Sequence, residues 1–302
     1  MKKVGLSLAP YQARFGDHRA LEIAKETGAD TVDFSLDYGA YEIGVEGSVY
    51  NKSDEEIVAH FKAIKEYADS LGLEVSQTHG RLPGFKNKPE EDDMLVKNAR
   101  LDCIATAALG APICVIHNAT TIFLGPDAPA ELYHKLSYDY FTRILPYAIE
   151  NGIKIATETF GDAVFFDCCD FFGYIDEFEK AFNAIIAIDE FKDHFTVCVD
   201  TGHSNKATRF GNPSAGDVIR RMGKYVSCLH LHDNDTLTDQ HRIPMTGCID
   251  WNDVFSALEE IGYEGVYNLE LNPIQFGEFM IEDAAEFGIR IMRKNLLHRE
   301  TM

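Results

Sequence analysis

Hydrophobic and polar positions follow a pattern that repeats eight times along the chain: a short apolar or β-branched run, a polar loop, and a longer segment with helical spacing. Short apolar runs that alternate with amphipathic segments are typical of βα units. The predicted strands are "KVGLSL", "DTVDFSL", "LEVSQTH", "PICVIHNA", "IKIATET", "TVCVDTG", "VSCLHLH" and "VYNLEL".

The intervening segments show the complementary helical period. In "DEEIVAHFKAIKEYADSLG" the apolar residues fall at i, i+4, i+7, i+10, i+11 and i+14, on one helix face: Ile57, Phe61, Ile64, Tyr67, Ala68 and Leu71. A glycine stands between a predicted helix and the next strand at five places, where it predicts a left-handed cap: Gly28, Gly72, Gly110, Gly152 and Gly262.

Eight βα units in 302 residues, with no low-complexity linker, predict an α/β fold. We expect a (β/α)8 TIM barrel that forms one domain over residues 1–302, because about 250 residues is typical of that barrel. An open, doubly wound sheet is the alternative. The first strand is followed by "LAPYQARFG", which lacks the GxGxxG loop that such a sheet uses for dinucleotides.

The net charge and the cysteine content indicate which binding partners and which cellular compartment to expect. The chain has 28 Lys and Arg against 49 Asp and Glu, a net charge of −21, which disfavours nucleic acid and anionic membranes as partners. Seven cysteines without a CxxC pair favour a reducing, cytoplasmic location. No apolar run approaches the roughly 20 residues that span a bilayer, and the first residues do not form a signal peptide.

Metal-binding side chains gather where the predicted strands end. In a TIM barrel the carboxyl ends of the strands carry the catalytic groups. A lone strand histidine is usually a core residue, and a lone strand-end carboxylate is often a helix cap. Six such residues on one rim predict a site instead: His79, His117, Glu158, Asp200, His232 and Glu270.

Strands five to eight supply the predicted primary metal ligands, Glu158, Asp200, His232 and Glu270. His230 and His232 share one face of the seventh strand, since side chains alternate. We assign the ligand role to His232, which is nearer the carboxyl end, and expect His230 to lie one layer below. Three carboxylates and one imidazole suit Mn²⁺, Zn²⁺, Co²⁺ or Mg²⁺.

The motifs "THG", "IHN", "TETF", "DTGHS", "HLHDND" with "DQH", and "LELNP" together resemble the xylose isomerase-like barrel superfamily of sugar isomerases, epimerases and endonuclease IV. The resemblance implies that Glu158 and Glu270 act as catalytic acid and base. It implies substrate contacts from His203, and we add His79, His117 and Arg242 as candidate substrate-binding residues. A cation on a carbonyl makes the neighbouring C–H acidic, so that proton transfer through an enediolate yields an isomer or epimer.

Two alternatives remain open. Endonuclease IV resembles the same motifs, and its three-zinc site implies additional candidate ligands here: His79, His117, His203, Asp239 and His241. The acidic charge and the absence of clustered basic loops disfavour a phosphodiesterase on abasic DNA. A lyase or dehydratase acting on a sugar-like substrate shares the first proton abstraction and is not separable by sequence.

The loop after strand seven departs from the family pattern. It reads "IPMTGCIDW", with Met245 where relatives often have a glycine, so the path of the loop and the roles of Asp239, His241 and Arg242 are open. No glycine-rich phosphate loop follows strands seven or eight, which favours an unphosphorylated or conjugated sugar. The sequence leaves open which sugar is bound, how many metal ions are held, and whether the chain forms a homo-oligomer.

Overall fold

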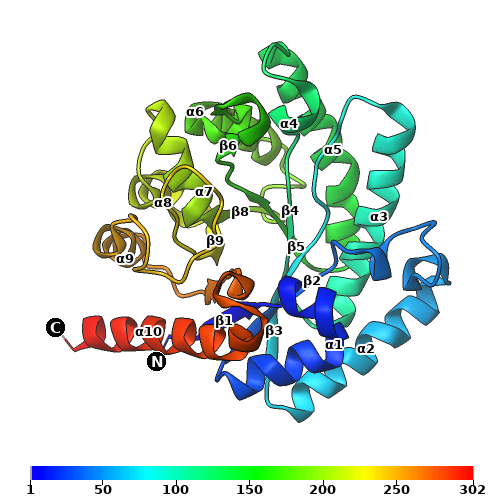
Figure 1. The fold of residues 1–302 in the computed structure, drawn as a ribbon. Helices are drawn as coiled ribbons and strands as arrows, with labels where there is room; N and C mark the ends of the chain where they lie inside the picture. Colours follow the sequence, from blue (N-terminus) through cyan, green and yellow to red (C-terminus); the bar gives the residue numbers. More distant parts are fainter. Residues whose placement is uncertain (1, 302) are drawn as a thin grey trace.

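A computed structural model describes residues 2–301, in which eight parallel strands form one sheet. The sheet curls into a central barrel surrounded by helices (Figure 1). This confirms the predicted (β/α)8 fold. The barrel strands are β1 Val4–Ser7, β2 Thr31–Ser35, β3 Glu74–His79, β4 Ile113–Ile116, β5 Lys154–Glu158, β8 Phe195–Asp200, β9 Val226–His230 and β10 Tyr267–Leu269.

Ten α-helices lie in the described residues. They are α1 Ala9–Glu26, α2 Asp54–Ser70, α3 Pro89–Ala108, α4 Thr121–Leu124, α5 Ala130–Glu150, α6 Ile175–Ile186, α7 Thr201–Ala207, α8 Ala215–Met222, α9 Trp251–Glu260 and α10 Ile281–Glu300. Single 3-10 turns punctuate the loops at Gly39–Tyr41, Val49–Asn51, Val164–Phe166, Phe171–Gly173, Thr208–Phe210, Gly223–Tyr225, Pro273–Phe276 and Glu278–Met280.

The barrel closes between its last two strands. Seven ladders join the strands in the order β10-β1-β2-β3-β4-β5-β8-β9. A single parallel bridge, Leu231 to Leu269, joins the remaining edges of β9 and β10. The hydrogen bonds there run from Leu231 N to Asn268 O (2.9 Å) and from Glu270 N to Leu231 O (3.2 Å).

Local sequence signals agree with the helices. Along α2, Ile57, Phe61, Ile64 and Ala68 are buried, as the apolar stripe predicts. Ser53 and Glu56 form a capping box at its start, which satisfies backbone N–H groups that the first turn leaves free. All five predicted glycine caps have positive φ: Gly28, Gly72, Gly110, Gly152 and Gly262.

A two-stranded hairpin, β6 Asp162–Ala163 with β7 Cys168–Cys169, extends the loop after β5. The buried Asp170 carboxylate accepts hydrogen bonds from Thr120 Oγ1 (2.6 Å), Thr121 N (2.8 Å) and Phe172 N (3.1 Å). It thereby ties the loop after β4 to the loop after β5. Burial raises the pKa of Asp170 to about 6 despite these donors.

The loop after β9 is organised by the buried side chain of Asp233. Its oxygens accept from Met245 N (3.0 Å), Ile249 N (3.2 Å) and Trp251 Nε1 (2.8 Å). Met245 has φ of 71°, the left-handed conformation that glycine adopts most readily. Met245, the residue that departs from the expected pattern, thus holds a backbone conformation that favours glycine.

Two further observations concern the whole chain. All seven cysteines are free thiols. No helix in residues 2–301 combines the length and the apolar character needed to cross a membrane.

Candidate metal and catalytic site

Four side chains from consecutive barrel strands converge inside the carboxyl end of the barrel. Glu158 ends β5, Asp200 ends β8, His230 ends β9, and Glu270 follows β10 directly. Each offers one ligand atom, and these atoms all lie within 4.8 Å of one another. We call Glu158, Asp200, His230 and Glu270 the inner group. Its chemistry is that of a site for a divalent cation.

Glu158 lies at the centre, almost fully buried among histidines. One carboxylate oxygen is 3.0 Å from His117 Nε2, and the other is 3.2 Å from His230 Nδ1 and 3.3 Å from His203 Nδ1. Burial by itself would raise the pKa of Glu158. The charge interactions with His117 and His230 are stronger and hold that pKa well below its usual range. The carboxylate is therefore ionised at neutral pH.

The structure groups His230, rather than His232, with the three carboxylates. Strand β9 ends at His230, so His232 lies two residues beyond the regular strand. His230 Nδ1 is 3.2 Å from Glu158 Oε1 and 3.4 Å from Glu270 Oε2. His230 Nδ1 and Glu158 Oε2 are both buried, and their close contacts with Glu158 Oε1 and His117 Nε2 do not have the geometry of hydrogen bonds. Such atoms are costly unless something binds them, and a cation in the inner group would bind both.

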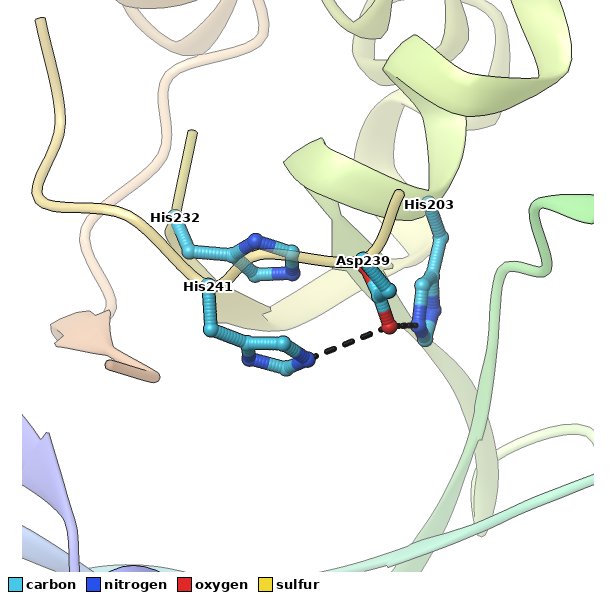
Figure 2. Close-up of side chains that lie close together, drawn as sticks. All are labelled: His203, His232, Asp239 and His241. Atoms are coloured by element: carbon cyan, nitrogen blue, oxygen red, sulfur yellow. Dashed lines mark hydrogen bonds and ion pairs between the residues drawn. The ribbon is translucent and has the colours of Figure 1, made fainter. Parts of the chain in front are cut away.

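His232 belongs to a second group nearer solvent, the outer group of His203, His232, Asp239 and His241, whose ligand atoms also lie within 4.8 Å of one another (Figure 2). Asp239 Oδ2 lies between His203 Nε2 (3.3 Å) and His241 Nε2 (3.2 Å). The rings of His232 and His241 are stacked, with centroids 3.9 Å apart. The outer group thus gathers three imidazoles around one carboxylate.

The hydrogen bonds of the outer group require a proton or a metal ion between the Asp239 carboxylate and the two histidine rings that face it. His203 Nδ1 donates to the Thr159 carbonyl (3.0 Å), and His241 Nδ1 donates to the Glu270 carbonyl (3.1 Å). A neutral ring protonated at Nδ1 presents only a lone pair at Nε2. Both Nε2 atoms face the Asp239 carboxylate, so either a second proton on each ring or a metal ion must separate them.

In the metal-free protein, protons fill this role. Burial opposes protonation of His241, but its hydrogen bond to the Asp239 carboxylate and the nearby Glu270 raise its pKa to about 9. Burial likewise opposes protonation of His203, whereas Asp200 and Asp239 raise its pKa well above the usual range. The pKa of Asp239 is held well below its ordinary value by His203, although burial acts in the opposite direction.

Asp200 connects the two groups and also caps a helix. Its Oδ1 accepts from His203 N (2.6 Å) at the start of α7, and its Oδ2 is 3.0 Å from His232 Nε2. The side chain can therefore be a helix cap and a candidate ligand together. A Cβ at Gly202 would lie 1.9 Å from the His232 ring, so only glycine fits beside it.

The other predicted site residues lie at different distances from these groups. His79 and His117 stand beside Glu158, with their Nε2 atoms 3.3 Å apart, and His79 forms a third candidate set with Glu158 and His230. Arg242 lies in neither group. Its Nη1 is 3.5 Å from the Thr246 carbonyl, and it lines a groove of about 470 Å³ with Phe276 and Phe287.

With this geometry in view, comparison with known proteins assigns the family. The chain matches the xylose isomerase-like TIM barrel family over residues 21–295. It belongs to that family.

Among relatives in this family, inosose isomerase from Bacillus subtilis (strain 168) is 26% identical over 158 residues, 50% of this chain and 52% of that protein. The chain thus spans about half the length of that relative. A D-tagatose 3-epimerase-like protein superposes with a TM-score of 0.74 at 18% identity, covering 99% of this chain and 100% of the other. The IolI protein with a bound zinc atom superposes with a TM-score of 0.71 at 20% identity, covering 98% of this chain and 97% of the other.

Structural neighbours in the family are thus named as sugar epimerases and isomerases, and one of them holds zinc. At these identities the superpositions show the fold. Two features of the site are not apparent from sequence motifs: the grouping of His230 with the three carboxylates, and the buried Asp33 beside it. Side-chain alternation along β2 was the available signal for Asp33, but alternation alone does not separate an interior polar residue from a ligand.

Proposed function

We propose that the protein is a divalent-metal-dependent isomerase or epimerase of a sugar or sugar derivative. The inner group carries this proposal, because it joins two carboxylates, Glu158 and Glu270, within one potential metal site. The geometry favours Glu158, Asp200, His230 and Glu270 as ligands, with His230 in place of His232. When bound, a divalent cation would polarise the substrate carbonyl and acidify the adjacent C–H.

Glu158 and Glu270 differ in a way that suits proton transfer. The side chain of Glu158 is 1% exposed and ionised, whereas that of Glu270 is 15% exposed. Glu158 can thus take a proton from carbon in a site shielded from water, and Glu270 can exchange its proton with solvent. His79, His117 and His203 surround Glu158, and in this proposal they bind substrate hydroxyl groups.

Solvent deuterium incorporation into a panel of ketoses tests the acid and base roles. Glu158→Gln and Glu270→Gln should each lower incorporation by about 100-fold or more, the usual contribution of general acid–base catalysis. Glu264→Gln, at an exposed position before β10, is the matched control and should behave as the unaltered protein. Undiminished incorporation by both site variants would exclude the assignment.

The outer group supports a second candidate, a multinuclear phosphodiesterase, because His203, Asp239 and His241 could hold a further cation. Metal content per chain and nicking of an abasic duplex at low salt separate the two functions. About one Mn, Co or Zn per chain without nicking favours the isomerase or epimerase. Near three zinc ions per chain with chelator-sensitive nicking favours the phosphodiesterase. A lyase or dehydratase would show deuterium exchange with loss of a leaving group, which product analysis detects.

A further inference from the structure

A buried carboxylate lies on the far side of His230 from the inner group. Asp33, on β2, is 0% exposed, and its Oδ2 is 3.1 Å from His230 Nε2. The other ring nitrogen, Nδ1, faces Glu158 and Glu270. The imidazole therefore spans the interior of the barrel between Asp33 and the candidate metal ligands.

Strand β2 is irregular at the point where Asp33 projects. Its register against β3 shifts between Val32 and Asp33, and Asp33 is then paired with Gln77. A bulge of this kind re-aims side chains locally. Both paired residues reach the same atom, since Gln77 Nε2 is also 3.1 Å from His230 Nε2. Two strands thus converge on one nitrogen of one histidine.

The partners of His230 determine which nitrogen carries hydrogen. A carboxylate oxygen accepts, so the contact with Asp33 favours an N–H at Nε2. Gln77 is compatible with that N–H when its side-chain amide is turned so that the amide oxygen, and not the nitrogen, faces His230. A neutral ring with hydrogen at Nε2 then has its lone pair at Nδ1, directed at Glu158 and Glu270. With a cation in the inner group, that lone pair becomes a ligand.

A purely structural role explains Asp33 poorly. Its Oδ1 has no hydrogen-bond partner, and its other contact is a long one, from Asn268 Nδ2 at 3.4 Å. A buried carboxylate so weakly compensated lowers stability relative to an apolar residue of similar size. The single short contact that Asp33 makes with a site residue is the one to His230.

We propose that Asp33 is a positioning residue that fixes the tautomer and orientation of His230 for metal binding. This rests on the proposed function, in which His230 is a ligand. Carboxylates that hold a ligating histidine in this way typically contribute 10- to 100-fold to metal affinity, by order of magnitude.

The test measures the dissociation constant for Zn²⁺ and Mn²⁺ by competition with a chromophoric chelator. Asp33→Leu should weaken binding by about 10- to 100-fold. Asp33→Asn should retain most of the affinity, because its amide oxygen still accepts from Nε2. Asp33→Ala replaces the leucine variant if that does not fold. The matched control is Asp102→Asn, which removes an equally buried carboxylate that pairs with Arg81 and Tyr50 outside both groups.

A double-variant cycle separates positioning from a general effect on the fold. If Asp33 acts through His230, Asp33→Leu should cause no further loss of affinity in the His230→Asn background. An unchanged affinity in Asp33→Leu, or an equal further loss in that background, would overturn the proposal while leaving His230 a ligand. An unchanged affinity in His230→Asn alone would overturn both this proposal and the ligand assignment beneath it.

Discussion

At the scale of single residues, His230 and His232 contact different groups although they lie on the same side of the chain. His230 contacts Glu158 and Glu270, whereas His232 contacts Asp200 and stacks on His241. We predict that His230→Asn weakens the first bound Zn²⁺ or Mn²⁺ by more than about 100-fold, beyond the effect of a supporting residue. His232→Asn, its matched partner, should weaken that ion by less than about tenfold. Chelator competition measures both, and the reverse ranking would return the ligand role to His232.

The raised pKa of His241 predicts a pH dependence for the metal-free protein. Its pKa is about 9 in the folded chain, above the usual value near 6.5, so its contribution to stability is fully present below about pH 6.5. That contribution, about 3 kcal/mol at most, is lost as the pH rises through about 9. Urea unfolding of the protein in the presence of a chelator measures this. As the pH rises through about 9, the free energy of unfolding should fall less for His241→Asn than for the unaltered chain. Parallel curves would contradict this account.

Sequence reasoning identified the residue types of the candidate site but not which histidine groups with the three carboxylates. Strand-end carboxylates and histidines were identifiable because barrel strands present their carboxyl ends on one rim. Alternation places His230 and His232 on the same side, and only the point where β9 ends decides which one meets Glu158. That point depends on pairing with β8 and β10, which is a non-local property.

At the scale of elements, the loop after β9 positions Asp239 and His241 through one unusual backbone conformation. Met245 has φ of 71°, which costs a non-glycine residue about 1–2 kcal/mol. We predict that Met245→Gly leaves the free energy of unfolding within about 1 kcal/mol of the original, since relief of strain offsets lost packing. Met245→Val should destabilise by about 2 kcal/mol, because a β-branched residue tolerates this conformation least.

Met245→Leu, which is unbranched at Cβ and of similar size, is the control for side-chain volume in that series. Urea denaturation midpoints give the comparison. Equal stability of the Val and Gly variants would show that the loop does not hold a left-handed residue at this position.

The elements themselves were largely predictable. All eight barrel strands and all five glycine caps lie where the hydrophobic pattern places them. The hairpin β6–β7 was not predicted, because strands of two residues carry no periodicity and depend on Asp170 holding the adjoining loops. The register shift at Asp33 was equally hidden, since it arises from the fit between β2 and β3.

At the scale of the whole molecule, carboxylates from four separate segments are held together in a chain with a net charge of −21. Removal of a bound cation leaves only protonated histidines to offset their repulsion. We predict that chelation lowers the melting temperature by several degrees and that added Mn²⁺ or Zn²⁺ restores it, because ligand at about 100 times its dissociation constant contributes roughly 2.7 kcal/mol. Calorimetry measures this, and an unchanged melting temperature would contradict it.

The single bridge that closes the barrel lies next to the candidate metal site, so metal binding and barrel closure involve the same segments. Leu231 and Leu269 join β9 to β10, and the adjacent residues, His230 and Glu270, are candidate ligands of one ion. A cation held there would crosslink the two edge strands of the sheet, β9 and β10, much as a covalent bond would. Loss of the ion should leave this closure to the backbone hydrogen bonds of one bridge, and the amides of Leu231 and Glu270 would be the first in the barrel to exchange their hydrogens with water.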